Sequence, residues 1–352
     1  MANKVFHYLF PFELESGNQL DSVEISYHTY GSLNPQKDNV VWVFHALTAN
    51  SDAADWWSGL VGDNKIFTPK KYFIVCANIL GSCLGTSGPL SINRKSGKKY
   101  YGKFPQITIR DITRAHILLK QHLGIEKILI GIGGSMGGYQ LLEWSILEKN
   151  LFSGIILMNT CARETAWAIA IHTAQRLALE ADATLFKANG KNNGAKGLKA
   201  ARAIGMLTYR NYEILKKTQT EENDSVLDNF KASSYINYQG EKLVNRFNAI
   251  SYWILTKAMD SHNIFRGRIN LNFSNRLAEE KKVLKRIKAK TLVIGISSDI
   301  LCPVAEQKFL ARNIPGAKIS ILDSPFGHDG FLTEGKKISA VIKKWLKIKF
   351  WL

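Results

Sequence analysis

The sequence predicts an α/β fold with a mainly parallel sheet that is covered by helices on both faces. Between residues 40 and 158, apolar runs of strand length alternate with helical patterns, as they do in βαβ units. These runs are hydrophobic at nearly every position, which is typical of parallel strands buried on both faces. The chain has 352 residues, 45% of them hydrophobic, and is long enough for such a core and an insertion.

The elements before residue 160 are mostly strands. Residues 1–38 are predicted to contain strands joined by turns, and the alternation over 23–30 is typical of a half-exposed strand. A helix is expected over 108–123, where Gly124 supplies a C-cap. The long loop over 78–89 is expected to be functional, since loops of this length in compact domains usually are. Buried strands are expected over 40–44, 72–77, 127–130 and 154–158.

A Gly-x-Ser-x-Gly motif, Gly133 to Gly137, follows the strand over 127–130 and precedes a helical pattern over 139–147. Strand, motif and helix in this order are the context of a nucleophile elbow, a tight turn that exposes the hydroxyl of Ser135 above the sheet edge. The two glycines avoid collisions where strand and helix pass closely. The N–H group of Met136, at the helix start, can help to bind an oxyanion. The alternative is a glycine-rich turn with an incidental serine.

The pattern changes to helical periodicity after residue 163, with almost no strand signal before residue 289. We therefore predict a helical cap over 164–288, which is inserted into a core domain of residues 1–163 and 289–352 and covers the catalytic end of the sheet. A polar, glycine-rich linker is expected over 190–197. Cap helices are expected over 166–182, 198–208, 209–218 and 241–257.

The last part of the chain supplies an acid and a base in two loops. Asp299 follows a buried strand expected over 291–296, and His328 follows the last strand, expected over 318–322. An activated serine needs a base and an orienting carboxylate, and in α/β-hydrolase folds these follow in the order Ser, Asp, His. We expect His328 to take the proton of Ser135 and Asp299 to hold the imidazole. Helices are expected over 304–313 and 334–346.

Each of these assignments has an alternative. Asp299 can act as a helix N-cap, since a helix opens near Pro303. Asp323 is a competing acid, although its position five residues before His328 is more typical of a turn. For His45, which precedes the expected oxyanion loop, a structural hydrogen-bonding role is favoured.

The composition argues against several classes of function. The formal net charge is +18 with a pI near 9.6, but the lysines are spread out, with concentrations over 281–290 and 336–349. We interpret this charge as a solvated surface and expect no nucleic-acid role, because no binding module accompanies it. No apolar run is as long as a membrane span and no signal peptide is evident, so we expect a cytoplasmic protein without membrane association. The cysteines and histidines lack metal-ligand spacing, so neither metal nor cofactor is expected.

Several stretches together resemble the homoserine O-acyltransferases of the α/β-hydrolase type, and the match runs over nearly the whole chain. The motifs that carry it lie at 45–48, 78–89, 133–138, 201–210 and 327–329, with further similarity at 235–240 and 246–252. The resemblance implies a ping-pong acylation of L-homoserine by an acyl-CoA, with acetyl-CoA the expected co-substrate, in methionine synthesis. It also implies a homodimer built from the cap helices.

The resemblance further implies roles for individual residues. Ser135 would attack the thioester, and the backbone N–H groups of Leu47 and Met136 would stabilise the oxyanion. Arg202 would bind the carboxylate of homoserine, for which a guanidinium fork is suited, and Asp329 would bind its amino group. Without the resemblance, Arg202 would be interpreted as an exposed helix charge and Asp329 as the cap of a turn.

Some positions depart from the family pattern. Ala49-Asn50 follows the 45–48 stretch where the family usually has glycine, and Tyr139 replaces a frequent methionine. These positions leave open succinyl-CoA as the donor and L-serine as the acceptor. A serine esterase or thioesterase with the same triad is the alternative, with water as the acceptor. A non-catalytic binding protein would require a broken triad, and here the triad is complete.

Overall fold

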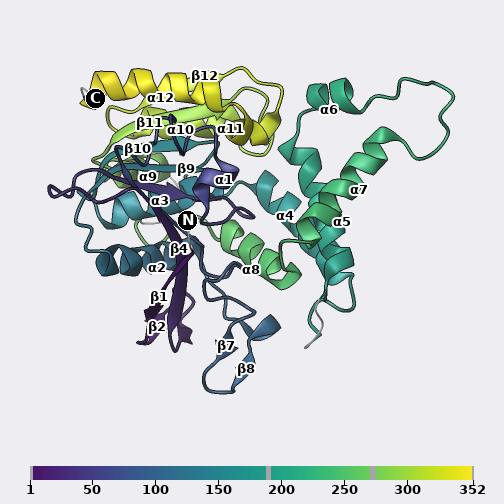
Figure 1. Ribbon diagram of the computed structural model, residues 1–352, viewed down its shortest axis with the longest axis horizontal. Coiled ribbons are helices and arrows are strands. Elements are labelled where there is room, and N and C mark those ends of the chain that lie inside the picture. Colours follow the sequence, from purple (N-terminus) through teal and green to yellow (C-terminus); the bar gives the residue numbers. More distant parts are fainter. Residues whose placement is uncertain (1–2, 188–191, 270–274, 351–352) are drawn as a thin grey trace.

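The computed structural model describes residues 3–187, 192–269 and 275–350 (Figure 1). The strands of its main sheet are β1 (Lys4–Tyr8), β4 (Val23–Tyr30), β5 (Val40–Phe44), β6 (Phe73–Ala77), β9 (Ile128–Gly134), β10 (Phe152–Met158), β11 (Lys290–Ile296) and β12 (Lys318–Leu322). Across the described residues, their order is β1-β4-β6-β5-β9-β10-β11-β12. β4 pairs antiparallel with β1 and β6, and all later neighbours are parallel. The predicted, mainly parallel sheet is therefore confirmed.

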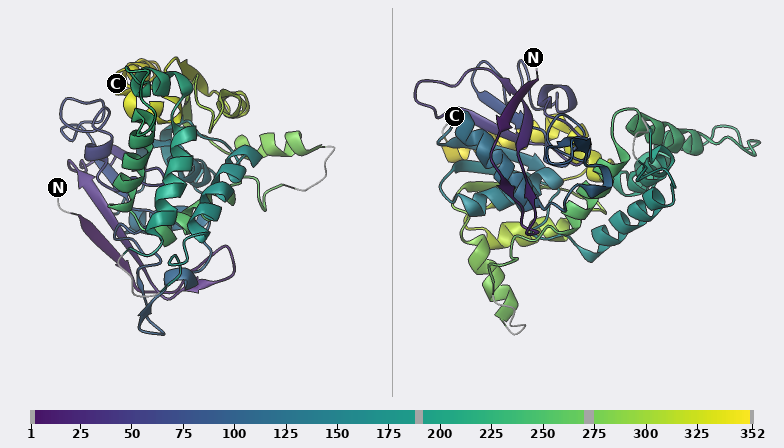
Figure 2. Two further views of the ribbon diagram at one scale, coloured as in Figure 1. Left: turned by 90° about the vertical axis from the view of Figure 1, so that its right-hand side faces the viewer. Right: turned by 90° about the horizontal axis from the view of Figure 1, so that it is seen from below.

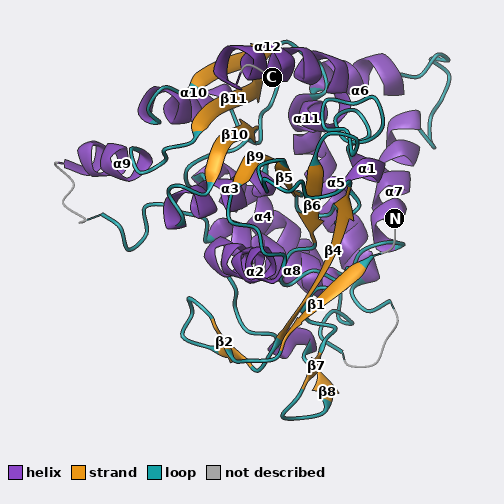
Figure 3. Ribbon diagram, turned by 60° about the vertical axis from the view of Figure 1, so that its left-hand side comes forward, coloured by secondary structure: helices purple, strands orange, loops and turns teal. Residues whose placement is uncertain are grey.

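Successive residues of the central strands point into two hydrophobic cores on opposite faces of the sheet. In β5, Trp42 and Phe44 belong to one core, and Val41 and Val43 belong to the other. The first core includes residues of α2 (Ile109–His122), α3 (Met136–Leu147) and α10 (Val304–Asn313), and the second includes residues of α12 (Gly335–Phe350). Helices thus cover both faces, as expected, and Figure 3 shows the strands in a row between them.

In the described residues, two short hairpins lie outside the main sheet. β2 (Phe12–Glu13) pairs with β3 (Gln19–Leu20), and β7 (Ile92–Asn93) pairs with β8 (Lys98–Lys99). Short helices are α1 (Ala53–Trp56), η1 (Tyr101–Lys103), η3 (Gly327–Asp329) and α11 (Gly330–Thr333).

The expectation that residues 23–30 form a half-exposed strand is wrong. In β4, only Glu24 is exposed. The loop after β6 runs along this strand, and its side chains complete the hydrogen bonds of the strand: Ser87 Oγ accepts from Glu24 N–H and Thr86 Oγ1 accepts from Ser26 N–H. Polar residues such as Ser26 can therefore be buried, because their polar groups have partners.

A helical insertion lies between β10 and β11. Its helices are α4 (Ala166–Glu180), α5 (Ala195–Tyr209), α6 (Tyr212–Gln219), α7 (Lys231–Val244), α8 (Ala249–Asp260) and α9 (Arg276–Leu284). α5 packs against α4 and α7, and α4 also packs against α8. Figures 1 and 2 show α4, α5, α6 and α7 as a lobe beside the sheet, with α8 between the lobe and the strands, whereas α9 contacts α10. The predicted domain limits stay a prediction.

Two helix limits in this insertion were predicted wrongly. The single helix expected over 241–257 is divided into α7 and α8, because Asn248 caps α8 by accepting the N–H groups of Ile250 and Ser251. The helix expected from residue 209 begins at Tyr212, after Asn211 caps it in the same way. Of the linker expected over 190–197, residues 190–191 lie outside the described residues, and α5 already begins at Ala195.

Candidate active site

Ser135 lies in the turn between β9 and α3, with φ of +54° and ψ of −128°. This conformation is strained for a residue other than glycine, and the surrounding backbone holds it. The N–H of Ser135 donates to the carbonyl of Met158 at 2.9 Å, and the hydroxyl of Thr160 donates to the carbonyl of Ser135 at 3.1 Å. The serine side chain therefore lies at the cavity wall in a fixed position.

Both glycines of the motif are required by close backbone contacts. A Cβ atom on Gly133 would lie 2.5 Å from the carbonyl of Gly137, and one on Gly137 would overlap the carbonyl oxygen of Phe44. The reason predicted for these glycines, that strand and helix pass too closely for a side chain, is confirmed.

His328 and Asp299 are in direct contact. Nδ1 of His328 lies 2.8 Å from Oδ2 of Asp299. A carboxylate only accepts hydrogen bonds, so Nδ1–H is the donor and Nε2 carries the lone pair of a base. Both residues are buried. The competing acid, Asp323, is exposed and accepts a hydrogen bond from Ser297 Oγ instead.

The two oxygens of Asp299 have different tasks. Oδ1 accepts the N–H groups of Leu301 and Cys302, each at 2.9 Å. Oδ2 accepts the side-chain amide of Asn159 at 2.7 Å besides the His328 imidazole. Oδ1 therefore caps the following backbone, as the N-cap alternative predicts, while Oδ2 orients the imidazole of His328. Sequence reasoning gave Asn159 no role, because nothing near it marks it as a partner of residue 299.

The electrostatics around His328 favour its charged form. Burial of the imidazole lowers its pKa, but the charge of Asp299 and the hydrogen bond to it outweigh burial, so the pKa of His328 is raised. A histidine with a raised pKa is a stronger base for the proton of a serine hydroxyl.

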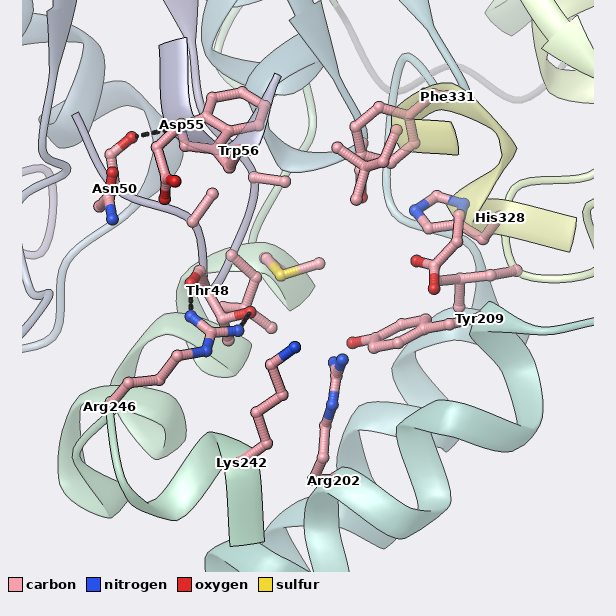
Figure 4. Close-up of a pocket in the computed structure, with 18 residues that line it drawn as sticks. Thr48, Asn50, Asp55, Trp56, Arg202, Tyr209, Lys242, Arg246, His328 and Phe331 are labelled. Atoms are coloured by element: carbon pink, nitrogen blue, oxygen red, sulfur yellow. Dashed lines mark hydrogen bonds between the residues drawn. The ribbon is translucent and has the colours of Figure 1, made fainter. Parts of the chain in front are cut away.

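Ser135 and His328 line one cavity of about 400 Å³ beneath the cap (Figure 4). In the described part of the chain, no direct hydrogen bond joins the Ser135 hydroxyl to the His328 imidazole. Hydrogen bonds between catalytic side chains often shorten only when the substrate binds. The cavity wall is apolar at Leu47, Trp56 and Phe331, among others. Its charged lining residues are Asp55, Arg202, Lys242, Arg246, and Asp329.

The backbone near Leu47 and Met136 has free donors. Within the described residues, the N–H groups of Leu47 and Met136 donate to no acceptor, and the first N–H groups of a helix have no partner inside it. His45 holds the loop that carries Leu47: its Nε2 accepts the N–H of Ile79 at 3.2 Å, and its Nδ1 bonds the carbonyl of Ala46 at 2.8 Å. Burial lowers the pKa of His45 to about 4, so it is neutral. Its structural role is confirmed.

Arg202 and Asp329 lie in the same cavity as Ser135. The guanidinium of Arg202 lies over the ring of Tyr209, 5.2 Å from its centroid, so Arg202 is more than an exposed helix charge. Burial raises the pKa of Asp329, an effect that the charges of Arg210 and Arg202 oppose.

Sequence reasoning missed two of the arginines at this site. Nε of Arg210 lies 3.4 Å from Oδ2 of Asp329. Arg246, in the turn before α8, donates to both the carbonyl and the hydroxyl of Thr48, next to Leu47 (Figure 4). Arg210 lies in the 201–210 motif and Arg246 in the 246–252 stretch, but no spacing rule relates either of them to its partner.

Two features are absent from residues 3–187, 192–269 and 275–350, a metal-ligand cluster and a membrane-spanning helix. No cluster of three or more His, Cys, Asp or Glu side chains there can hold a metal ion. None of the helices described is both long and apolar enough to cross a bilayer.

This chain is similar to known proteins over almost its whole length. The family model for the alpha/beta hydrolase fold matches residues 39–335. A homoserine O-acetyltransferase of Cyclobacterium marinum is 44% identical over 345 residues, which cover 98% of this chain and 95% of that protein. The crystal structure of a homoserine O-acetyltransferase from Staphylococcus aureus matches with a TM-score of 0.81 and 27% identity, covering 100% and 97% of the two chains. An esterase structure matches with a TM-score of 0.86 over 98% and 99%, but at 21% identity this likeness concerns the fold alone.

Proposed function

The chain belongs to the homoserine O-acetyltransferases of the α/β-hydrolase fold, and we propose that it transfers an acetyl group from acetyl-CoA to the hydroxyl of L-homoserine. The products are O-acetyl-L-homoserine and CoA. The observation that carries this proposal is that one cavity contains a cation and an anion, Arg202 and Asp329, beside Ser135 and His328. An amino-acid zwitterion needs one fixed charge of each sign, whereas hydrolysis of an ester or thioester needs neither.

In the first half-reaction, Oγ of Ser135 attacks the thioester carbonyl while Nε2 of His328 takes the serine proton. The N–H groups of Leu47 and Met136 donate to the oxyanion of the tetrahedral intermediate. When the intermediate collapses, the C–S bond breaks and His328 gives the proton to the departing thiolate. CoA leaves, and Ser135 carries the acetyl group as an ester.

In the second half-reaction, the hydroxyl of homoserine occupies the place of the departed thiol. His328 takes its proton, the resulting alkoxide attacks the acetyl-enzyme, and the same two N–H groups bind the second oxyanion. When this intermediate collapses, the bond between the acetyl carbon and Oγ of Ser135 breaks, and His328 returns the proton to Oγ. Arg202 binds the carboxylate and Asp329 the ammonium group, so the hydroxyl is positioned close to the ester.

Replacing Arg202 with alanine should raise the KM for homoserine by about 10–100-fold, because a hydrogen-bonded ion pair of about 1.5–3 kcal/mol is lost. The rate of CoA release in the first half-reaction should stay near the parent value. Lys199→Ala is the matched control: it removes a cation from the same helix, where Lys199 pairs with the exposed Glu241 and does not line the cavity. An unchanged KM in Arg202→Ala would remove the argument for the carboxylate site.

The pH dependence follows from the raised pKa of His328. The base must be neutral to accept a proton, so kcat/KM should fall as the pH drops through the pKa of this histidine. Because Asp299 raises that pKa, the acid limb should lie above the ordinary histidine value of about 6.5. A pH–rate profile of the parent enzyme with acetyl-CoA measures it. A profile that stays flat down to about pH 5 would show that His328 is not the base.

The experiment that tests the proposed function follows thiol release from acetyl-CoA or succinyl-CoA, with homoserine, serine or no acceptor. We expect rapid turnover only with acetyl-CoA and homoserine. Rapid release without an acceptor would identify a thioesterase, and faster turnover with succinyl-CoA or serine would identify a different transferase.

The proposed function also leads to expectations about the pathway, the compartment, the cofactors and the oligomeric state of the enzyme. We expect the enzyme to serve methionine synthesis in the cytoplasm, where both charged substrates are available, and to need no metal or cofactor besides acetyl-CoA as a co-substrate. A homodimer through the cap helices is expected from the family resemblance, and sedimentation analysis measures it.

A further inference from the structure

A second, smaller pocket of about 210 Å³ adjoins the active-site cavity on the cap side. It shares three cationic lining residues with the cavity, so the same side chains border both spaces. Figure 4 shows Lys242 and Arg202 reaching side by side from α7 and α5, with Arg246 beyond Lys242. Among the described residues, four cations line this pocket together with Gln239 and Leu243, and no carboxylate does; the cations are Arg202, Arg210, Lys242 and Arg246.

Two of these four charges already have a partner or a task. Arg210 pairs with Asp329, and Arg202 is the carboxylate ligand in the proposed function. Among the residues that the structure describes, no carboxylate neutralises the other two: Arg246 bonds only uncharged oxygens of Thr48, and Lys242 makes no ion pair. Desolvation and the charge of Arg202 lower the pKa of Arg246. Like charges so close together repel one another, and a bound anion would relieve that repulsion.

We propose that Lys242 and Arg246 bind a phosphate group of the CoA part of the donor. This inference rests on the proposed function, in which homoserine brings a single carboxylate and CoA brings the phosphates. Lysine and arginine are suited to phosphate oxygens. Both residues also line the cavity of Ser135, so the donor lies with its thioester toward the serine and its phosphates toward α7.

The test uses Lys242→Gln. Arg246 is less suitable, because its replacement would remove both the proposed phosphate contact and the hydrogen bonds that hold Thr48 next to Leu47. With acetyl-CoA as the donor, kcat/KM for the donor should fall about tenfold, the loss expected for one charge-assisted contact. With S-acetylpantetheine, which has no phosphate, the parent and Lys242→Gln should be equal. Lys199→Gln, which removes a cap lysine outside both pockets, should match the parent with both donors.

A binding measurement makes the test independent of turnover. Adenosine 3′,5′-bisphosphate, the phosphate-bearing end of CoA, should bind the parent and Lys199→Gln equally and bind Lys242→Gln about tenfold more weakly. An equal loss with both donors, or a loss confined to kcat/KM for homoserine, would overturn the proposal. If the parent transfers no acetyl group to homoserine, the proposed function fails, and binding of the nucleotide still decides whether the phosphate site exists.

Discussion

Replacing Ser135 with alanine should lower kcat/KM by about 10⁴-fold or more, because the mechanism loses its only nucleophile and no acyl-enzyme can form. Among the described residues, the hydroxyl of Ser135 has no hydrogen-bond partner, whereas the backbone of Ser135 is held by Met158 and Thr160. Alanine at this position should therefore keep the turn. Thiol release from acetyl-CoA in the presence of homoserine measures the effect.

Ser145→Ala is the matched control for this change. Ser145 lies on α3, is buried, and donates its hydroxyl to the carbonyl of Leu141 without reaching the cavity. Its replacement should leave kcat/KM within about threefold of the parent, because it alters only packing inside the helix. A rate for Ser135→Ala within tenfold of the parent would exclude serine as the nucleophile.

Asp299→Asn should lower kcat by about 10³–10⁴-fold, the size expected when the acid of a triad loses its charge. The carboxylate of Asp299 accepts four hydrogen bonds, from His328, Asn159, Leu301 and Cys302. An amide has one acceptor oxygen, so some of these donors lose their partner, and the imidazole loses the contact that fixes its tautomer. The free energy of unfolding should fall by about 1–3 kcal/mol as well.

Asp323→Asn separates the catalytic effect from a general loss of negative charge. Asp323 is exposed and bonds Ser297, so its replacement should change neither kcat nor Tm appreciably. Steady-state kinetics and thermal unfolding of both variants test this pair of expectations. Equal kinetic losses in the two variants would mean that the acid was assigned wrongly.

Much of the fold could be predicted because its signals are local. The apolar runs of the parallel strands mark their own positions, and the motif around Ser135 marks the turn between β9 and α3. The failures arose where a single residue or a distant segment decided the structure. Asn248 starts a new helix inside a stretch whose hydrophobic periodicity continues without a break, and β4 is buried by a loop whose path cannot be predicted from the sequence of the strand.

In the candidate site, too, some contacts could be predicted from the sequence and others could not. The order of Ser135, Asp299 and His328 was sufficient to predict the contact between the acid and the base, because loops that follow parallel strands meet at one edge of the sheet. The contacts of the cap could not be predicted. Arg246 reaches Thr48 across 198 positions of sequence, and Arg210 reaches Asp329 only because α5 and η3 come together.

The central claim is that Ser135 carries the acetyl group between the two substrates. Mass spectrometry of the protein mixed with acetyl-CoA, without acceptor, tests it most directly. We predict one acetyl group on the peptide that contains Ser135, none in Ser135→Ala, and its removal as O-acetyl-L-homoserine when homoserine is added. Transfer at the full rate without any adduct, or an adduct on another residue such as Cys83, would contradict the account.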